Sequence, residues 1–114
     1  MVHEMKLKGE FFNLIKSGVK TYEIRLNDEK RKLIKIGDII IFKKEPDLEE
    51  SFETKVKNLI YFNSFKDMAN SLPLKNVGFE NKSINYVVDI YHQFYSIENE
   101  TKFGVLAIEI ERIK

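Results

Sequence analysis

Apolar and polar residues alternate with a period of two over residues 3–8, which predicts a short β-strand. In residues 9–17 the apolar side chains instead recur at helical spacing, and Gly18 stands where a left-handed helix cap is needed. Residues 21–26 are β-branched and aromatic, and they predict a second strand. The chain is therefore expected to begin as strand, helix and strand.

The middle of the chain predicts two further strands. Residues 39–42 are apolar on both faces, as expected for a central strand of a sheet. Residues 52–61 alternate between apolar and polar side chains, which is typical of a half-buried strand. Between these segments, Pro46 and the acidic residues 47–50 predict a solvated loop.

Serine residues mark the starts of two predicted helices in the last third of the chain. Ser64 and Asp67 form a capping-box pattern ahead of a helix that Pro73 would end. Ser83 precedes a longer apolar stripe at helical spacing, which we interpret as core. Residues 105–113 predict a last strand in which Leu106, Ile108 and Ile110 point inward. The order of elements lacks regular strand–helix alternation and predicts an α+β fold, with a curled, mostly antiparallel sheet and helices at its ends.

Length and composition are those of one globular domain spanning residues 1–114. No internal repeat or low-complexity linker interrupts the chain. The absence of cysteine excludes disulfides and thiolate metal sites, and two histidines do not suggest a metal centre. We therefore expect no metal and no cofactor. No apolar run approaches the length of a membrane span, so a cytoplasmic protein is the simplest expectation.

The net charge of +1 conceals two halves of opposite sign. Residues 1–44 hold 11 lysines and arginines against 6 acidic residues, whereas residues 45–114 hold 8 against 12. A basic half attracts phosphate groups if its charges also gather in space. A mixed, solvated surface explains the same charges, and the lysine count alone is weak evidence for nucleic acid binding.

Three charged residues crowd the segment after Gly18, namely Lys20, Glu23 and Arg25. Glu23 and Arg25 share one face of a strand, and Lys20 at its start can turn toward the same side. A lysine held beside an arginine has a lowered pKa and can act as a general base. Equally, Lys20 and Arg25 can bind phosphate or base-edge acceptors while Glu23 accepts from an amino group. The structural alternative is an ion pair on an exposed face, which contributes little stability.

The pattern Gly18-x-Lys20-x-x-Glu23-x-Arg25 resembles the Gly-x-Lys-x-x-Glu-x-Arg signature of the ASCH domain family, within the PUA-like superfamily. Similar flanking segments lie on both sides of it, at residues 3–7, 25–31, 36–42, 95–100 and 104–108. The resemblance implies a small PUA-like β-barrel with helices near its ends, in which the signature residues line a cleft. It also implies an RNA-related role, through binding of RNA or a nucleotide, or through action on a modified nucleoside.

One branch of the family that resembles this chain hydrolyses the amide of N4-acetylcytidine with a lysine, a threonine and a glutamate. That branch has its threonine three positions after the lysine, where this chain has Glu23. Thr21 follows Lys20 directly and would point elsewhere on a regular strand. Glu80 is the candidate for the remaining carboxylate, because it precedes the helix that Ser83 is expected to cap.

Five other residues extend the candidate site. Lys30 and Arg31 belong to a basic turn that suits the phosphates of RNA, and a solvated turn explains them equally well. Tyr95, Ser96 and Glu98 would form a loop that closes over the cleft, with Tyr95 stacking on a base. The alternative for Tyr95 is the end of an apolar helix stripe.

We therefore expect a binding module for RNA or a nucleotide, with Lys20, Glu23 and Arg25 forming the cleft and the basic turn its rim. The alternative is a hydrolase that acts on a modified nucleoside or on RNA. In that alternative Lys20 is the general base, Glu23 or Glu98 assists it, and Arg25 stabilises developing negative charge. In a third interpretation the charged strand is only structural.

Overall fold

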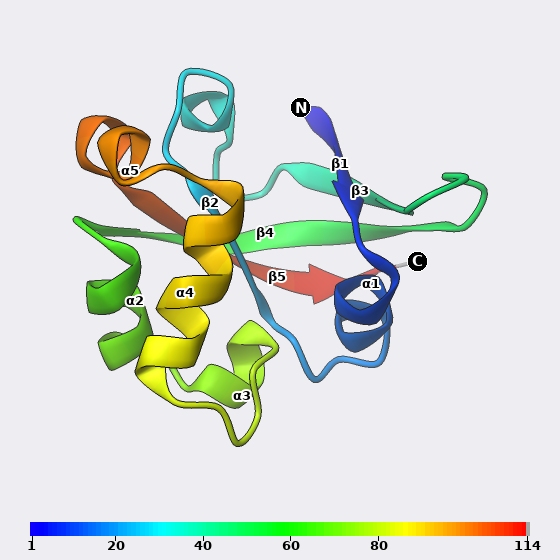
Figure 1. Cartoon of the computed structure of the whole chain (residues 1–114). Coiled ribbons are helices and arrows are strands. Elements are labelled where there is room, and N and C mark those ends of the chain that lie inside the picture. Colours follow the sequence, from blue (N-terminus) through cyan, green and yellow to red (C-terminus); the bar gives the residue numbers. More distant parts are fainter. Residues whose placement is uncertain (114) are drawn as a thin grey trace.

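The computed structural model describes residues 1–113, which form one five-stranded sheet with helices packed on it (Figure 1). The strands are β1 (Val2–Leu7), β2 (Tyr22–Leu26), β3 (Ile39–Lys44), β4 (Ser51–Phe62) and β5 (Val105–Arg112). Their order across the sheet is β1-β3-β4-β5-β2, so β1 and β2 are its two edges. β1 pairs parallel with β3, and the other pairings are antiparallel. The expected α+β class, with a curled and mostly antiparallel sheet, is confirmed.

Helices cover the sheet at several points along the chain. They are α1 (Gly9–Lys16), α2 (Phe65–Ser71), α3 (Leu74–Val77), α4 (Ile84–Phe94) and α5 (Ile97–Phe103), with a 3-10 turn at Arg31–Leu33. The predicted serine caps are present. Ser64 accepts a hydrogen bond from the N–H of Asp67, and Ser83 accepts one from the N–H of Tyr86.

Two short helices, α5 and α3, differ from expectation. The expected closing loop at residues 95–100 is instead largely α5, because the hydroxyl of Ser96 caps it by accepting from the N–H of Asn99 at 3.1 Å. Pro73 ends α2 as predicted, but it also starts α3, since its fixed φ suits the entry to a helix. Serine and proline thus start more helices here than their spacing suggested.

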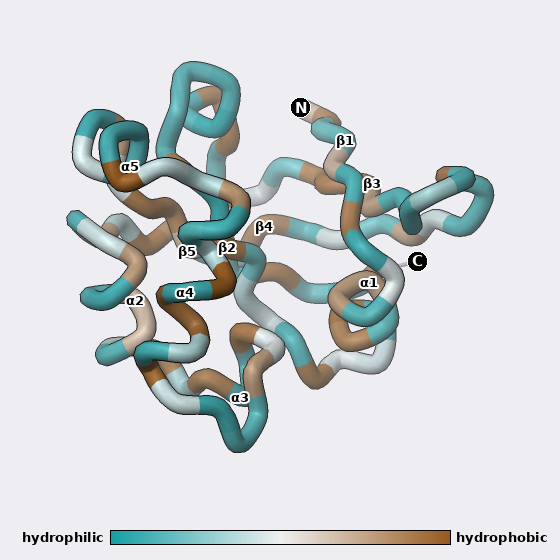
Figure 2. The backbone as a smooth tube through the Cα atoms, in the orientation of Figure 1, coloured by the Kyte–Doolittle hydropathy of each residue, from teal (hydrophilic) through white to brown (hydrophobic). Residues whose placement is uncertain are grey.

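The sheet separates two hydrophobic clusters, and apolar segments recur along the strands and α4 (Figure 2). Leu106, Ile108 and Ile110 of β5 belong to the first cluster, as predicted. Val105 and Ala107, on the opposite face of the same strand, belong to the second. β5 is therefore buried on both faces, which is why it occupies an interior position between β4 and β2.

Glu100 is a buried carboxylate that ties three helices together. Its Oε2 accepts from the N–H of Phe65 at 2.7 Å, and its Oε1 lies 2.7 Å from Nε2 of His92. The first N–H groups of a helix have no partner within that helix, so the carboxylate satisfies one such donor of α2. α5, which carries Glu100, is thereby held against α2 and α4.

Asp38 anchors the start of β3 to β1. Its Oδ2 lies 2.8 Å from Nε2 of His3 and accepts from the N–H of Lys35 at 3.0 Å. These hydrogen bonds, with that of His3 the larger influence, lower the pKa of Asp38 to about 2. The ionised carboxylate is therefore a stabilising group of this corner of the sheet.

The pKa of Asp38 makes stability depend on pH in a defined window. An aspartate has a pKa of about 3.9 in an unfolded chain, so the Asp38 carboxylate stabilises the fold above that value. This contribution is lost as pH falls toward the folded-state pKa of about 2. Asp38→Asn should lower the free energy of unfolding at neutral pH and flatten its decline across this window, as measured by urea unfolding. Exposed Asp89→Asn is the matched control, and parallel pH curves for Asp38→Asn and the parent protein would contradict the assignment.

Candidate functional site

Gly18 brings the charged segment to the edge of the sheet. Its φ of +85° lies in the left-handed region, which glycine adopts without strain. The N–H groups of Val19 and Lys20 then bond to the carbonyl of Leu14, at 3.1 and 3.0 Å. The chain consequently turns sharply after α1 and enters β2 with the Lys20 side chain directed into the interior.

Lys20 is buried, with 2% of its surface exposed, and its ammonium group has three partners. Nζ donates to the carbonyl of Tyr22 and, at 2.8 Å, to the carbonyl of Val77 in α3. Nζ also lies 3.3 Å from Oε1 of Glu23. An ammonium has three N–H donors, so this set occupies all of them. Burial lowers the pKa of Lys20, and its attraction to Glu23 opposes that shift.

Glu23 is the buried carboxylate that holds both cations. Its Oε2 accepts from Nε of Arg25 at 2.7 Å, while Oε1 faces Lys20. Burial alone would raise the pKa of Glu23, but the charges of Arg25 and Lys20 together hold it below its usual value. Burial likewise disfavours the charged form of Arg25, but the Glu23 carboxylate raises its pKa above the usual value. Glu23 and Arg25 are therefore both charged at neutral pH.

Arg25 also links the two edges of the sheet. Its Nη2 donates to the carbonyl of Lys6 in β1 at 3.0 Å. β1 and β2 do not pair with each other along their lengths, so the guanidinium spans the gap between them. Among residues 1–113 this is the one hydrogen bond between the two edge strands.

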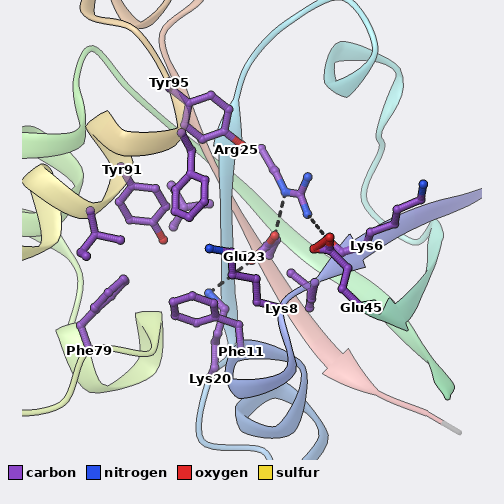
Figure 3. Close-up of a pocket in the computed structure, with 14 residues that line it drawn as sticks. Lys6, Lys8, Phe11, Lys20, Glu23, Arg25, Glu45, Phe79, Tyr91 and Tyr95 are labelled. Atoms are coloured by element: carbon purple, nitrogen blue, oxygen red, sulfur yellow. Dashed lines mark hydrogen bonds and ion pairs between the residues drawn. The ribbon is translucent and has the colours of Figure 1, made fainter. Parts of the chain in front are cut away.

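A cavity of about 220 Å³ opens at this gap, between α4 on one side and the β1–α1 segment on the other (Figure 3). Pockets for drug-sized molecules occupy roughly 300–1,000 Å³, so this cavity suits a smaller group. Aromatic side chains make up much of its wall, namely Phe11, Phe79, Tyr91, Phe94 and Tyr95. The charged residues that line it are Lys6, Lys8, Lys20, Glu23, Arg25 and Glu45.

The cavity combines flat apolar walls with an excess of positive charge. Four cations and two carboxylates line it, which gives a net charge of +2. Nζ of Lys8 lies 4.5 Å from the ring centre of Phe94, so a cation–π contact joins the two sides. Among the described lining residues there is no serine, threonine, cysteine or histidine. Flat apolar walls with charged groups at their edges are suited to holding a planar, polar group.

Four of the residues singled out in the sequence line this cavity: Lys20, Glu23, Arg25 and Tyr95. The others do not. Arg31 is the first residue of the 3-10 turn that follows β2, and Lys30 directly precedes it. Ser96 and Glu98 are exposed at the start of α5, and Glu80 is exposed between α3 and α4.

The sequence interpretation missed most of the cavity wall. Phe11 and Tyr91 lie on helix faces whose apolar spacing predicts core, and Tyr91 does belong to the second hydrophobic cluster. Only the placement of α1 and α4 on opposite sides of the cavity shows that these rings also face it. Lys6, Lys8 and Glu45 carried no signal beyond their charge.

Of the described residues, no group of three or more histidine or acidic side chains is placed to hold a metal ion. Over the same range, no helix has both the length and the apolar character to cross a membrane.

The buried charges predict a strong dependence of stability on Glu23. Glu23→Gln leaves the buried ammonium and guanidinium without their counter-charge, which costs about 3–5 kcal/mol. The free energy of unfolding, measured in urea, should fall by that amount, while exposed Glu111→Gln should have little effect. Adding Lys20→Met to Glu23→Gln should cost less than the sum of the single changes, by about 0.5–3 kcal/mol. Strict additivity would show that these two side chains do not interact.

Comparisons with known proteins agree with this architecture. The model of the ASCH domain matches residues 5–114. A structure described as the hypothetical protein PH0355 is 47% identical, with a TM-score of 0.89, covering 99% of this chain and 100% of that one. Protein PF0455 from Pyrococcus furiosus is 42% identical, with a TM-score of 0.81, covering 100% and 99%.

More distant structures share the fold. The ASCH protein of Zymomonas mobilis is 13% identical, with a TM-score of 0.65, covering 95% of this chain and 65% of that one. The ASCH domain from Lactobacillus crispatus is 15% identical, with a TM-score of 0.67, covering 97% and 79%. A search of curated proteins found no match.

Proposed function

The chain belongs to the ASCH domain family, and from this we propose that its cavity binds one nucleobase of RNA or of a nucleotide. The observation that carries the proposal is the buried Lys20–Glu23–Arg25 network beneath aromatic walls. Aromatic faces stack on a planar base, and fixed charges supply polar contacts at its edge. The volume of about 220 Å³ favours one base over a larger segment.

Energetics supports a functional role for the buried network. Three charged groups removed from water are weak evidence for stability, because apolar residues of similar volume often serve as well or better. The network does, however, hold the Arg25 guanidinium in one orientation at the cavity wall. Preorganised donors of this kind increase affinity, since little ordering remains when a ligand binds.

Basic residues around the cavity suit the phosphates of an RNA chain. Lys6 and Lys8 are exposed at the β1 side of the cavity, where a base held inside would bring its own phosphate. We assign Lys30 and Arg31, which lie outside the cavity, to phosphates of flanking nucleotides. Contacts of this kind contribute affinity that falls with salt and is independent of sequence.

The second candidate is hydrolysis of a modified nucleoside with Lys20 as general base. The observation in its favour is that burial lowers the pKa of Lys20. Against it, each N–H of the Lys20 ammonium already has a partner. Thr21 does not line the cavity, and Glu80 and Glu98 lie exposed outside it. We therefore prefer binding of a base to hydrolysis as the proposed function.

Removal of the Tyr95 ring tests base stacking. Tyr95→Ala should weaken binding of short single-stranded RNA by about 1–3 kcal/mol, or roughly 5- to 150-fold in Kd, because one stacking surface is lost. Fluorescence anisotropy with labelled homopolymers measures this, and Tyr95→Phe should retain most of the affinity. Tyr61→Ala removes an exposed tyrosine of β4 outside the cavity and serves as the control.

The same samples distinguish binding from hydrolysis. Chromatography of RNA and of N4-acetylcytidine after incubation should show both unchanged if the domain only binds. Release of cytidine that Lys20→Ala abolishes would favour the hydrolase. Equal RNA affinity in Tyr95→Ala and Tyr61→Ala would overturn the placement of a base in this cavity.

A further inference from the structure

The edge of β2 that borders the cavity presents main-chain groups as well as side chains. The carbonyl of Thr21 accepts from Ile110, and the N–H of Asn27 donates to Gly104. In an antiparallel pair the bonded positions alternate, so residues 23 and 25 direct both of their main-chain groups toward β5. Ile24 lies between them, and its N–H and C=O point the other way, into the cavity that it lines.

Of the described β2 residues that face away from β5, only Ile24 lines the cavity. The carbonyl of Tyr22 is occupied by the Lys20 ammonium, and the Arg25 guanidinium crosses to the Lys6 carbonyl. Among residues 1–113 no hydrogen bond reaches the N–H or C=O of Ile24 from β1 or from a side chain. An added peptide strand would need alternating main-chain groups over several residues. The single donor and acceptor of Ile24 instead match one planar group.

Tyr91 adds a third polar group at the same place. Only 8% of this residue is exposed, and its hydroxyl, which keeps some accessible surface, makes no hydrogen bond to the described part of the chain. In Figure 3 the hydroxyl of Tyr91 points into the cavity, toward Glu23. Burial raises the pKa of Tyr91 well above its usual value, so the hydroxyl stays protonated and can both donate and accept.

We propose that Ile24 and Tyr91 select a base whose edge carries a carbonyl beside a ring N–H, as in uracil and guanine. The Ile24 N–H donates to the base carbonyl, the Ile24 C=O accepts from the ring N–H, and the Tyr91 hydroxyl contacts the same edge. This inference rests on the proposed function, because it assumes that a base occupies the cavity.

The balance of donors and acceptors favours a base with a carbonyl beside a ring N–H over cytosine or adenine, which lack that pair. Both oxygens of Glu23 are engaged, by Lys20 and Arg25, so this carboxylate has little capacity left for an amino group. Arg25 uses Nε and Nη2 within the protein, and its Nη1 donates to no described residue. Free donors thus outnumber free acceptors, which suits a ligand edge rich in oxygen.

Nuclear magnetic resonance with nucleosides tests this selection directly. Uridine and inosine are each titrated into a separate sample of the intact protein. Parallel titrations use N3-methyluridine, N1-methylinosine, cytidine and adenosine, and changes in amide chemical shift give the Kd of each nucleoside. The methyl groups remove the ring N–H and leave the stacking face intact. We expect each methylated nucleoside to bind at least tenfold more weakly than its parent, and the Ile24 amide to gain protection from exchange only with the parents.

A pair of variants on one helix isolates the hydroxyl. Tyr91→Phe keeps the buried ring and should weaken uridine binding about tenfold, the usual effect of one hydrogen bond. Tyr86→Phe removes an exposed hydroxyl of α4 outside the cavity and should change nothing. Circular dichroism melting of both variants checks that each is folded.

The possible outcomes separate the two proposals. If RNA binds through Tyr95 but the N-methylated nucleosides, cytidine and adenosine bind as tightly as uridine and inosine, the selection by Ile24 and Tyr91 is wrong and the proposed function stands. Tighter binding of cytidine or adenosine than of uridine and inosine would also overturn the selection. If no RNA and no nucleoside binds, the proposed function fails and takes this inference with it.

Discussion

The two ion pairs of the Glu23 carboxylate, with Lys20 and with Arg25, are the interactions on which this structure depends. The carboxylate lies in the interior between the Lys20 ammonium and the Arg25 guanidinium. Each of these two cations also bonds to a different element of the fold. Lys20 extends to the Val77 carbonyl of α3, and Arg25 to the Lys6 carbonyl of β1. The Glu23 carboxylate in β2 thus holds α3 and β1 in fixed positions relative to β2.

The cavity is a consequence of this arrangement. β1 and β2 approach each other at the two edges of the sheet, where ordinary strand pairing would have closed a barrel. Here the two strands are unpaired, and the Arg25 guanidinium connects them at one point. The space between them is then available to a ligand, bordered by main-chain groups that strand pairing would have consumed. The same side chains that hold the fold together therefore shape the candidate site.

Much of the fold was predictable, because period-two and helical spacing identify the strands and the longer helices. α5 was missed since its formation depends on Ser96 as a cap and on the distant contact of Glu100 with Phe65. The candidate site was only half predictable. A signature in eight consecutive residues identified its charged centre. Phe11 and Tyr91, in contrast, occupy helix faces that cannot be distinguished from core until the positions of α1 and α4 in the fold are known.

A crystal structure of the protein grown with saturating uridine or guanosine would show whether a nucleobase occupies the cavity beside β2. We predict an ordered base between the β1 side of the cavity and the rings of Tyr91 and Tyr95, with its edge against the main chain of Ile24. An empty cavity at a concentration that saturates binding in solution, or a base ordered elsewhere on the surface, would contradict it.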